Sequence, residues 1–267
     1  MGTPVLVLVV ALYSAVATAY LEARRRREAP PTWARIVGPL AATAHLAGLV
    51  LLSAQIRQSP FSTTSQALSF LAFSLVALYL VLEATSRVAT HGGGFYAAAA
   101  LLAAVGVPGL VDAAPSAIGA VKDNMRTYHV GLSLMGTAAV FAGGLLAGGY
   151  LGQYRRVKGG DLKGGEEGPS LRGFERLARG ASLLGTLLLG PSLVLGVVTA
   201  RQEPSPANTI ILTSMTAVCF FLLVAAGWIW WRRPLKGRTA AWLNLLALIV
   251  VLVAFFLVHP LVLAGAR

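Results

Sequence analysis

Charged residues are scarce in this sequence. Asp, Glu, Lys and Arg together make up 12% of its 267 residues, whereas soluble globular domains carry about 25%. Acidic residues are the rarer kind, with 10 Asp and Glu against 22 Lys and Arg. Hydrophobic residues reach 56% and stand in long uninterrupted runs. This composition excludes a soluble domain of this size.

Cysteine is almost absent, because Cys219 is the single one in the chain. One thiol excludes a disulfide within the chain, a CxxC redox pair and a cysteine-based zinc site. Cys219 lies within an apolar run, where a small buried core residue is its expected role.

The apolar residues gather in blocks of the length that a membrane-crossing helix needs, which is about 20 residues. Backbone polar groups in lipid must be satisfied internally, so each block should be a helix. We therefore expect an all-α integral membrane protein, a bundle of about eight transmembrane helices in which residues 1–267 form a single polytopic membrane domain. The blocks are residues 5–23, 33–56, 67–88, 94–111, 127–151, 181–199, 209–231 and 239–264.

The basic residues indicate an orientation for these helices. A signal peptide carries its positive charge before its apolar core, but here Arg24–Arg27 follow the first block. We therefore expect a retained first helix, with the N- and C-termini both outside. All but five of the 22 Lys and Arg residues then lie inside, as the positive-inside rule requires. The charge of +12 is thus explained by orientation and contact with anionic lipid, and no nucleic-acid partner is expected.

Two further segments bear on packing and on partners. The longest hydrophilic segment, at about residues 153–180, is glycine-rich and expected on the inner side. Its stretch "SLRGFERLAR" is compatible with a short amphipathic helix lying on the inner leaflet. Gly144 and Gly148 have the GxxxG spacing that favours close approach of two helices.

Histidines at membrane depth are the candidate functional residues. His45 falls near the middle of the second block, His129 begins the fifth, and His259 lies near the outer end of the eighth. Ionisable residues within a membrane usually mark a site or pathway. His129 and His259 are expected at the same depth, where a pair could ligate a metal, bind heme iron from both sides or relay protons.

Coordination chemistry argues against a zinc site at this histidine pair and is compatible with heme, but it does not decide the function. Two histidines make a poor zinc site, which needs three or four ligands. Heme needs two axial ligands and an apolar wall, and Phe255 and Phe256 share the side of the helix that carries His259. Arg126, one turn before His129, could pair with a heme propionate. The alternative is that each histidine caps a helix end or bonds a loop carbonyl, and spacing alone favours neither reading.

Three segments together resemble the cytochrome c assembly family, which includes the CcsA heme-lyase subunits, CcmC and the HemX-like proteins. "AHLAGLVLLSAQIRQSPFSTTSQALSFLAFSLVALYLVLEATSR" is similar to the family's second and third helices. "MRTYHVGLSLMGTAAVFAGGLLAGGYLGQYRR" resembles the family helix that a histidine begins, and "GRTAAWLNLLALIVVLVAFFLVHPL" resembles its last helix. Length and helix count are most like the HemX-like branch.

The resemblance implies a role for each histidine. His129 and His259 would be the axial ligands of a non-covalent, b-type heme on the outer side, and His45 would have a supporting or transit role. The bacterial inner membrane would be the location. Heme lyases also carry an outer tryptophan-rich segment of the type W-G-x-x-W-x-W-D-P, where this chain reads "VLGVVTARQEPSPANTIILT". This departure disfavours heme-lyase activity, so an enzyme is not the expected reading.

Two functions of different classes follow. The first is a membrane heme-binding protein that handles, transfers or exports heme in cytochrome c assembly or heme homeostasis. The second is a non-catalytic membrane anchor or regulator, whose inner basic loop binds a cytochrome c assembly or heme-synthesis protein. A small-solute or proton-coupled transporter has less support, because His45 alone would have to serve as its midplane ionisable residue.

Overall fold

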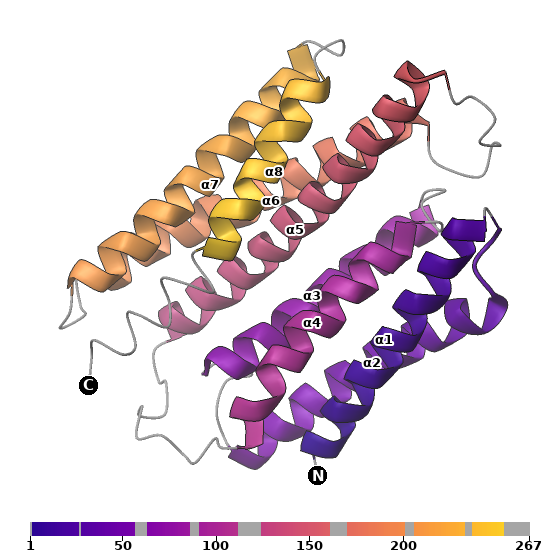
Figure 1. The fold of residues 1–267 in the computed structure, drawn as a ribbon. Coiled ribbons are helices and arrows are strands. Elements are labelled where there is room, and N and C mark those ends of the chain that lie inside the picture. Colours follow the sequence, from indigo (N-terminus) through magenta and orange to yellow (C-terminus); the bar gives the residue numbers. More distant parts are fainter. Residues whose placement is uncertain are drawn as a thin grey trace. The chain divides into compact units, whose positions relative to one another are not determined.

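A computed structural model describes residues 2–26, 28–56, 63–85, 91–111, 124–160, 170–200, 206–232 and 237–253, at some helix ends for the backbone alone. All regular secondary structure in these ranges is helical (Figure 1). The helices are α1 (Gly2–Arg26), α2 (Thr32–Ile56), α3 (Thr64–Thr85), α4 (Gly92–Val111), α5 (Asn124–Lys158), α6 (Leu171–Ala200), α7 (Pro206–Arg232) and α8 (Gly237–Val253). The chain forms two compact units, unit 1 with α1–α4 and unit 2 with α5–α8.

Unit 1 is a bundle in which α1 packs against α2 and α4, and α3 packs against α4 and, less extensively, against α2. Part of its core joins Leu6 of α1 to Leu49 and Leu52 of α2, with Phe70 and Phe73 of α3 packed against them. This cluster therefore ties α1, α2 and α3 together within the unit.

The start of α3 is fixed by a reciprocal pair of hydrogen bonds. The backbone N–H of Gln66 donates to Oγ1 of Thr63, and the backbone N–H of Thr63 donates to Oε1 of Gln66, both at 3.2 Å. This capping box gives a hydrogen-bond acceptor to two backbone N–H groups that would otherwise lack one at the start of a helix. The helix consequently begins directly after Thr63.

Unit 2 is a closed ring of four helices, with α5 against α6 and α8, α6 against α7, and α7 against α8. Small residues let α5 approach α8. A Cβ atom at Gly144 would lie 2.6 Å from Cδ2 of Leu248, and one at Gly143 would lie 2.9 Å from Oδ1 of Asn244. Of the expected GxxxG pair, Gly144 lies at this contact, but a Cβ at Gly148 would meet no atom within 4 Å. The two positions are four residues apart, and only Gly144 faces α8.

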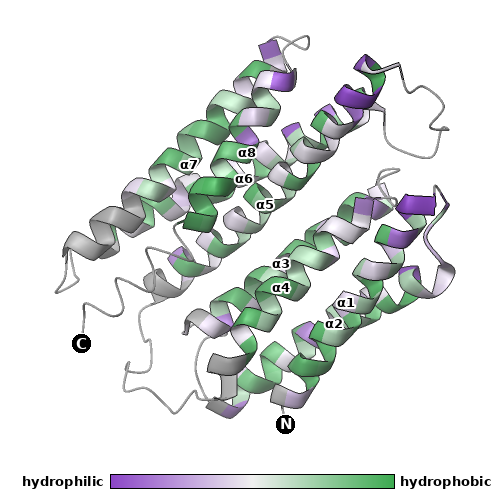
Figure 2. Cartoon of the chain, viewed as in Figure 1, coloured by the Kyte–Doolittle hydropathy of each residue, from purple (hydrophilic) through white to green (hydrophobic). Residues whose placement is uncertain are grey.

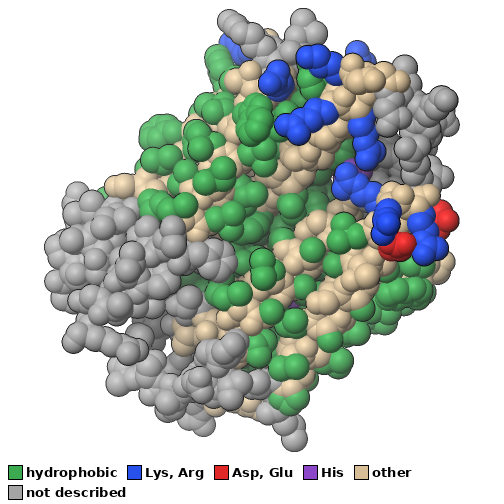
Figure 3. All heavy atoms as spheres, viewed as in Figure 1, with side chains coloured by type: hydrophobic (Ala, Val, Ile, Leu, Met, Phe, Trp, Pro, Cys, Tyr) green, Lys and Arg blue, Asp and Glu red, His purple; other side chains and the backbone are tan. Residues whose placement is uncertain are grey.

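The helices of both units are hydrophobic over most of their length (Figure 2). Leu40, Val50, Leu187, Val194 and Phe221 are each more than half exposed. Figure 3 shows hydrophobic side chains over the helix flanks and Lys and Arg gathered near helix ends. Exposed apolar surface of this extent is typical of a face that contacts another apolar phase, here lipid.

Five helices of the described ranges are long and apolar enough to cross a membrane. They correspond to α1, α2, α3, α5 and α6, while shorter apolar segments lie in α4, α7 and α8. The predicted all-α, multi-pass membrane class agrees with this architecture. The number of helices that cross the membrane, the side of each terminus and the single membrane domain stay predictions.

The inner-leaflet helix expected from "SLRGFERLAR" is not a separate element. Residues from Leu171 onward form the first turns of α6, which continues without a break to Ala200. The block of residues 181–199 therefore covers only the apolar part of a longer helix. The sequence prediction stopped where hydropathy changes, but the backbone hydrogen bonds continue through the polar turns.

Candidate functional site

His129 lies in α5 and is bound to α6. Its Nδ1 lies 2.8 Å from the backbone carbonyl oxygen of Ser192. A carbonyl oxygen only accepts hydrogen bonds, so Nδ1 must carry a proton and donate it. The neutral tautomer that results has its lone pair on Nε2. The imidazole is thus held in one tautomer and one direction by a helix carbonyl, and not by a loop.

Two serines complete this contact between α5 and α6. The Ser192 side chain is fully buried. Its hydroxyl lies 3.2 Å from Nδ1 of His129 and donates to the His129 carbonyl oxygen at 3.3 Å. The hydroxyl of Ser133, one turn after His129, makes a short hydrogen bond to the Ser192 hydroxyl. His129, Ser133 and Ser192 therefore form a polar cluster, which we call the His129 cluster.

The imidazole packs closely against Gly196 of α6. A Cβ atom at Gly196 would stand 2.8 Å from Cε1 of His129 and 3.4 Å from both ring nitrogens. Any side chain at position 196 would therefore push the ring away from the Ser192 carbonyl. The glycine is needed here for close approach, since α6 already takes up helical angles at this point.

The other residues predicted for this site cannot be compared with His129. His259, Phe255 and Phe256 lie outside the described residues. Arg126 is within α5, but its side chain also lies outside the described part. The expected pairing of His129 with His259 stays a prediction.

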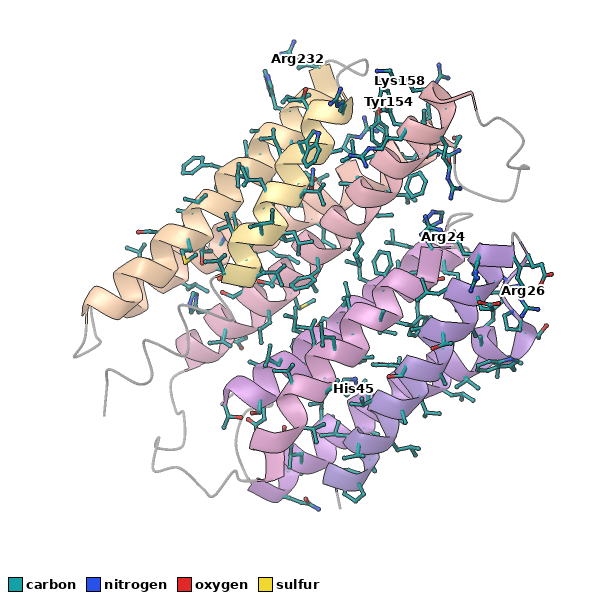
Figure 4. The ribbon with its side chains drawn as sticks, in the orientation of Figure 1. Arg24, Arg26, His45, Tyr154, Lys158 and Arg232 are labelled. Atoms are coloured by element: carbon teal, nitrogen blue, oxygen red, sulfur yellow. The ribbon has the colours of Figure 1, made fainter. Side chains whose placement is uncertain are left out.

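His45 lies in unit 1 and is completely buried (Figure 4). Its Nδ1 is 3.2 Å from the hydroxyl of Tyr13 in α1, and its Nε2 is 2.8 Å from the hydroxyl of Ser69 in α3. The rings of Tyr13 and Phe73 pack against it, with centroids 5.6 and 6.0 Å away. Its position near the middle of α2 is as predicted, but both nitrogens are hydrogen-bonded within the bundle.

Four buried tyrosines were missed by the sequence reasoning. Tyr13, Tyr20, Tyr79 and Tyr96 are each at most 1% exposed and lie in unit 1. Among the residues that the structure describes, the hydroxyl of Tyr96 has no hydrogen-bond partner, and such a buried group costs about 1–3 kcal/mol. The only local signal in the sequence is the seven-residue spacing of Tyr13 and Tyr20, which puts them on one face of α1.

Metal chemistry based on three or more protein ligands is not indicated in the described ranges, where no cluster of His, Cys, Asp and Glu could hold an ion. Cys219 is buried and its thiol lies 3.5 Å from the Ala247 carbonyl oxygen. This agrees with its expected role as a small core residue.

Basic side chains mark one end of several helices. Arg24 and Arg26 lie at one end of unit 1, away from His45, and Arg26 pairs with Glu22 at 2.8 Å (Figure 4). In unit 2, the guanidinium of Arg232 lies 4.8 Å from the centre of the Trp228 ring. On the first turns of α6, Arg172, Arg176 and Arg179 are exposed. Their spacing puts them on one face of the helix, and we call them the α6 basic face.

Comparisons with known proteins place the chain in a family. No curated protein and no solved structure matches it. The model of the Cytochrome C assembly protein family, however, matches residues 33–263, which include most of α2 and all of α3–α8. The HemX-like branch stays a prediction. Because the match covers most of its length, this multi-pass helical membrane protein belongs to the cytochrome c assembly protein family, which supports a role in cytochrome c biogenesis and heme handling.

Proposed function

We propose that this protein binds a non-covalent, b-type heme in the cytoplasmic membrane of a bacterium and handles or transfers it during cytochrome c assembly. His129 would be one axial ligand and His259 the other. Phe255 and Phe256 would supply an apolar wall, and Arg126 would pair with a propionate. The family match supports the heme-handling role. The contacts of His129 with α6 support its role as a heme ligand.

The observation that carries the proposal is the 2.8 Å contact from Nδ1 of His129 to the Ser192 carbonyl oxygen. Metal-binding histidines almost always donate their second ring N–H to a carbonyl, a carboxylate or water. Such a bond fixes the tautomer and makes the other nitrogen a better ligand. The half-buried imidazole of His129 thus has the chemistry that an axial ligand requires.

Heme, when bound, would supply an iron centre able to change oxidation state. The residues of this chain would bind and orient it. Ser192 and Ser133 would keep the imidazole of His129 aligned, and Gly196, which has no side chain, would leave room for the ring against α6. Covalent attachment of heme to another protein is not part of this proposal, because the outer tryptophan-rich segment is absent.

The test is the absorbance of the protein purified in detergent, before and after hemin is added. We expect a Soret band that is lost or greatly reduced in His129→Ala. His91→Ala, a histidine in unit 1, is the matched control and should keep the band. A wild-type protein without a Soret band after hemin addition would overturn the proposal, as would an unchanged band in His129→Ala.

A second candidate function is supported by the α6 basic face. Arg172, Arg176 and Arg179 are exposed, while Phe174 and Ala178 on the opposite side are buried. This face could bind an assembly or heme-synthesis protein on the inner side of the membrane. Changing the three arginines to glutamine should then lower recovery of that partner while the Soret band stays unchanged. Equal recovery of the partner with the triple variant would exclude this face as the contact.

A further inference from the structure

The start of α8 carries positive charge that no acidic residue of its own first turn offsets. The first backbone N–H groups of a helix have no acceptor within the helix, and the aligned peptide dipoles make this end positive. Acidic residues are favoured there, but α8 has none in its first turn. Its second residue is instead Arg238, whose side chain is exposed. A bound anion would offset both the helix dipole and the arginine.

A buried hydroxyl from α5 points at the same helix start. Tyr150 is only 8% exposed, and its hydroxyl would lie 2.6 Å from a Cβ atom at Gly237, the first residue of α8. Helical Cα–Cβ bonds tilt toward the N-terminus, so the hydroxyl lies at the N-terminal end of α8. Among the described residues, the Tyr150 hydroxyl makes no hydrogen bond. Buried hydroxyls are nearly always hydrogen-bonded, so a ligand that accepts one fits this place.

The acidic residue that interacts with Tyr150 does not take the place of such a ligand. Glu175 of α6 interacts electrostatically with Tyr150. Arg172 and Arg179, one turn before and one turn after Glu175 on the same helix, interact with it in turn. The negative charge of Glu175 is therefore already offset within α6.

The end of unit 2 at which α8 begins is rich in cations. Lys158 of α5 and Arg232 of α7 lie at this end (Figure 4). Arg155 and Arg156, in the last turn of α5, are exposed as well. The charge pattern of the sequence predicts that this end faces the inner leaflet, whose anionic lipids attract basic segments.

The exposed face of α8 indicates which kind of molecule carries the anion. Trp242, Leu246 and Ile249 are 49%, 45% and 54% exposed. Their spacing from Arg238 and from one another places all four along one face of the helix. From the helix start onward, this face is first cationic, then aromatic and then apolar. A phospholipid has the matching order of phosphate, glycerol and acyl chain, whereas a free anion would use only the first part.

We propose that the start of α8 binds the phosphate group of an anionic phospholipid of the inner leaflet. The backbone N–H groups of the first turn and the Tyr150 hydroxyl donate hydrogen bonds to the phosphate oxygens, and Arg238 pairs with the negative charge. Trp242 contacts the glycerol region, and an acyl chain lies along Leu246 and Ile249. The bound lipid thereby joins α5 to α8 at this end of unit 2.

The experiment measures the dissociation constant of the first bound lipid by native mass spectrometry of the full chain in detergent. The three probes are phosphatidylglycerol, a diacylglycerol with the same acyl chains, and inorganic phosphate. The site variants are Arg238→Gln and Tyr150→Phe, which leave the backbone of α8 unchanged. Arg156→Gln and Tyr154→Phe remove the same chemical groups from other positions of α5 and are the matched controls.

We expect Arg238→Gln to weaken phosphatidylglycerol binding at least about tenfold, because hydrogen bonds between charged groups are strong. Tyr150→Phe should weaken it about fivefold or more, because it removes one hydrogen bond to the phosphate. Both controls should bind like the wild type, and diacylglycerol should bind more weakly than phosphatidylglycerol.

Two results would overturn the phosphate site. One is equal phosphatidylglycerol binding by the wild type and both site variants, and the other is diacylglycerol binding as tight as that of phosphatidylglycerol. Inorganic phosphate that binds with the predicted dependence on Arg238 and Tyr150, while phosphatidylglycerol does not, would overturn the lipid as the occupant. All of these results are independent of whether heme binds at His129.

Discussion

At the scale of single residues, His45 and His129 differ in what fixes them. His129 is half-buried and anchored through Nδ1 to a carbonyl of α6, whereas both nitrogens of the fully buried His45 are bonded to hydroxyls. The first arrangement is the one that metal-binding histidines usually have, with one ring N–H donated to a carbonyl. The second is that of a residue built into its own bundle. His129, therefore, is the better candidate for an iron ligand in this structure.

The close contact between the His129 ring and Gly196 leads to a prediction for a single substitution. Gly196→Ala places a Cβ atom 2.8 Å from Cε1 of the imidazole and forces the ring off the Ser192 carbonyl. Loss of such an orienting contact lowers metal affinity about 10- to 100-fold in proteins. We expect a drop in hemin affinity of that order, measured by absorbance titration.

Gly180→Ala is the control on the same helix, because a Cβ atom there meets no atom within 4 Å. It should bind hemin like the wild type. If Gly196→Ala also binds hemin like the wild type, the contact with Ser192 does not position a ligand.

The sequence predicted which residues to examine at this scale, but not what they touch. His45 and His129 stand out because imidazoles are rare in apolar blocks. Their partners cannot be read from local spacing, because Ser192 is 63 residues from His129 and Tyr13 is 32 residues from His45. These contacts depend on which helix faces which, and that follows from the packing of whole helices.

At the scale of helices, close approach depends on which face a small residue occupies. Gly144 faces Leu248 of α8, whereas Gly148 faces no neighbour, although the two have the same GxxxG spacing. The spacing predicted a contact but not its partner or its extent. In the same way, hydropathy located the apolar part of α6 but not its start at Leu171, since polar turns propagate a helix as well as apolar ones do.

The two glycines of α5 make a matched pair of variants. Gly144→Ala puts a methyl group 2.6 Å from Cδ2 of Leu248, and overpacking of this kind costs about 1–3 kcal/mol. Gly148→Ala adds no clash and replaces a helical glycine, which gains about 0.5–1 kcal/mol. Thermal unfolding in detergent, followed by loss of helical circular dichroism, should show a lower midpoint for the first and an equal or higher one for the second. The reverse order would show that α5 and α8 do not approach as described.

At the scale of the whole molecule, the charge pattern predicts an orientation that can be measured directly. Glu28, before α2, and Ser170, before α6, are exposed and expected on the inner side, while Gln55 is exposed near the other end of α2. In a Cys219→Ala background, single cysteines at these positions can be treated with a membrane-impermeant maleimide. We expect Gln55→Cys to react in intact spheroplasts, and Glu28→Cys and Ser170→Cys to react only after lysis. The opposite pattern would reverse the topology and place His129 on the inner side.

The central claim, that a heme iron is held between His129 and a second histidine, is tested most directly by electron paramagnetic resonance of the ferric protein loaded with hemin. Two imidazole ligands give a strong axial field, so we predict a low-spin signal in the wild type and its replacement by a high-spin signal in His129→Ala. A wild-type protein whose bound heme is high-spin, or a low-spin signal that persists in His129→Ala, would contradict the account.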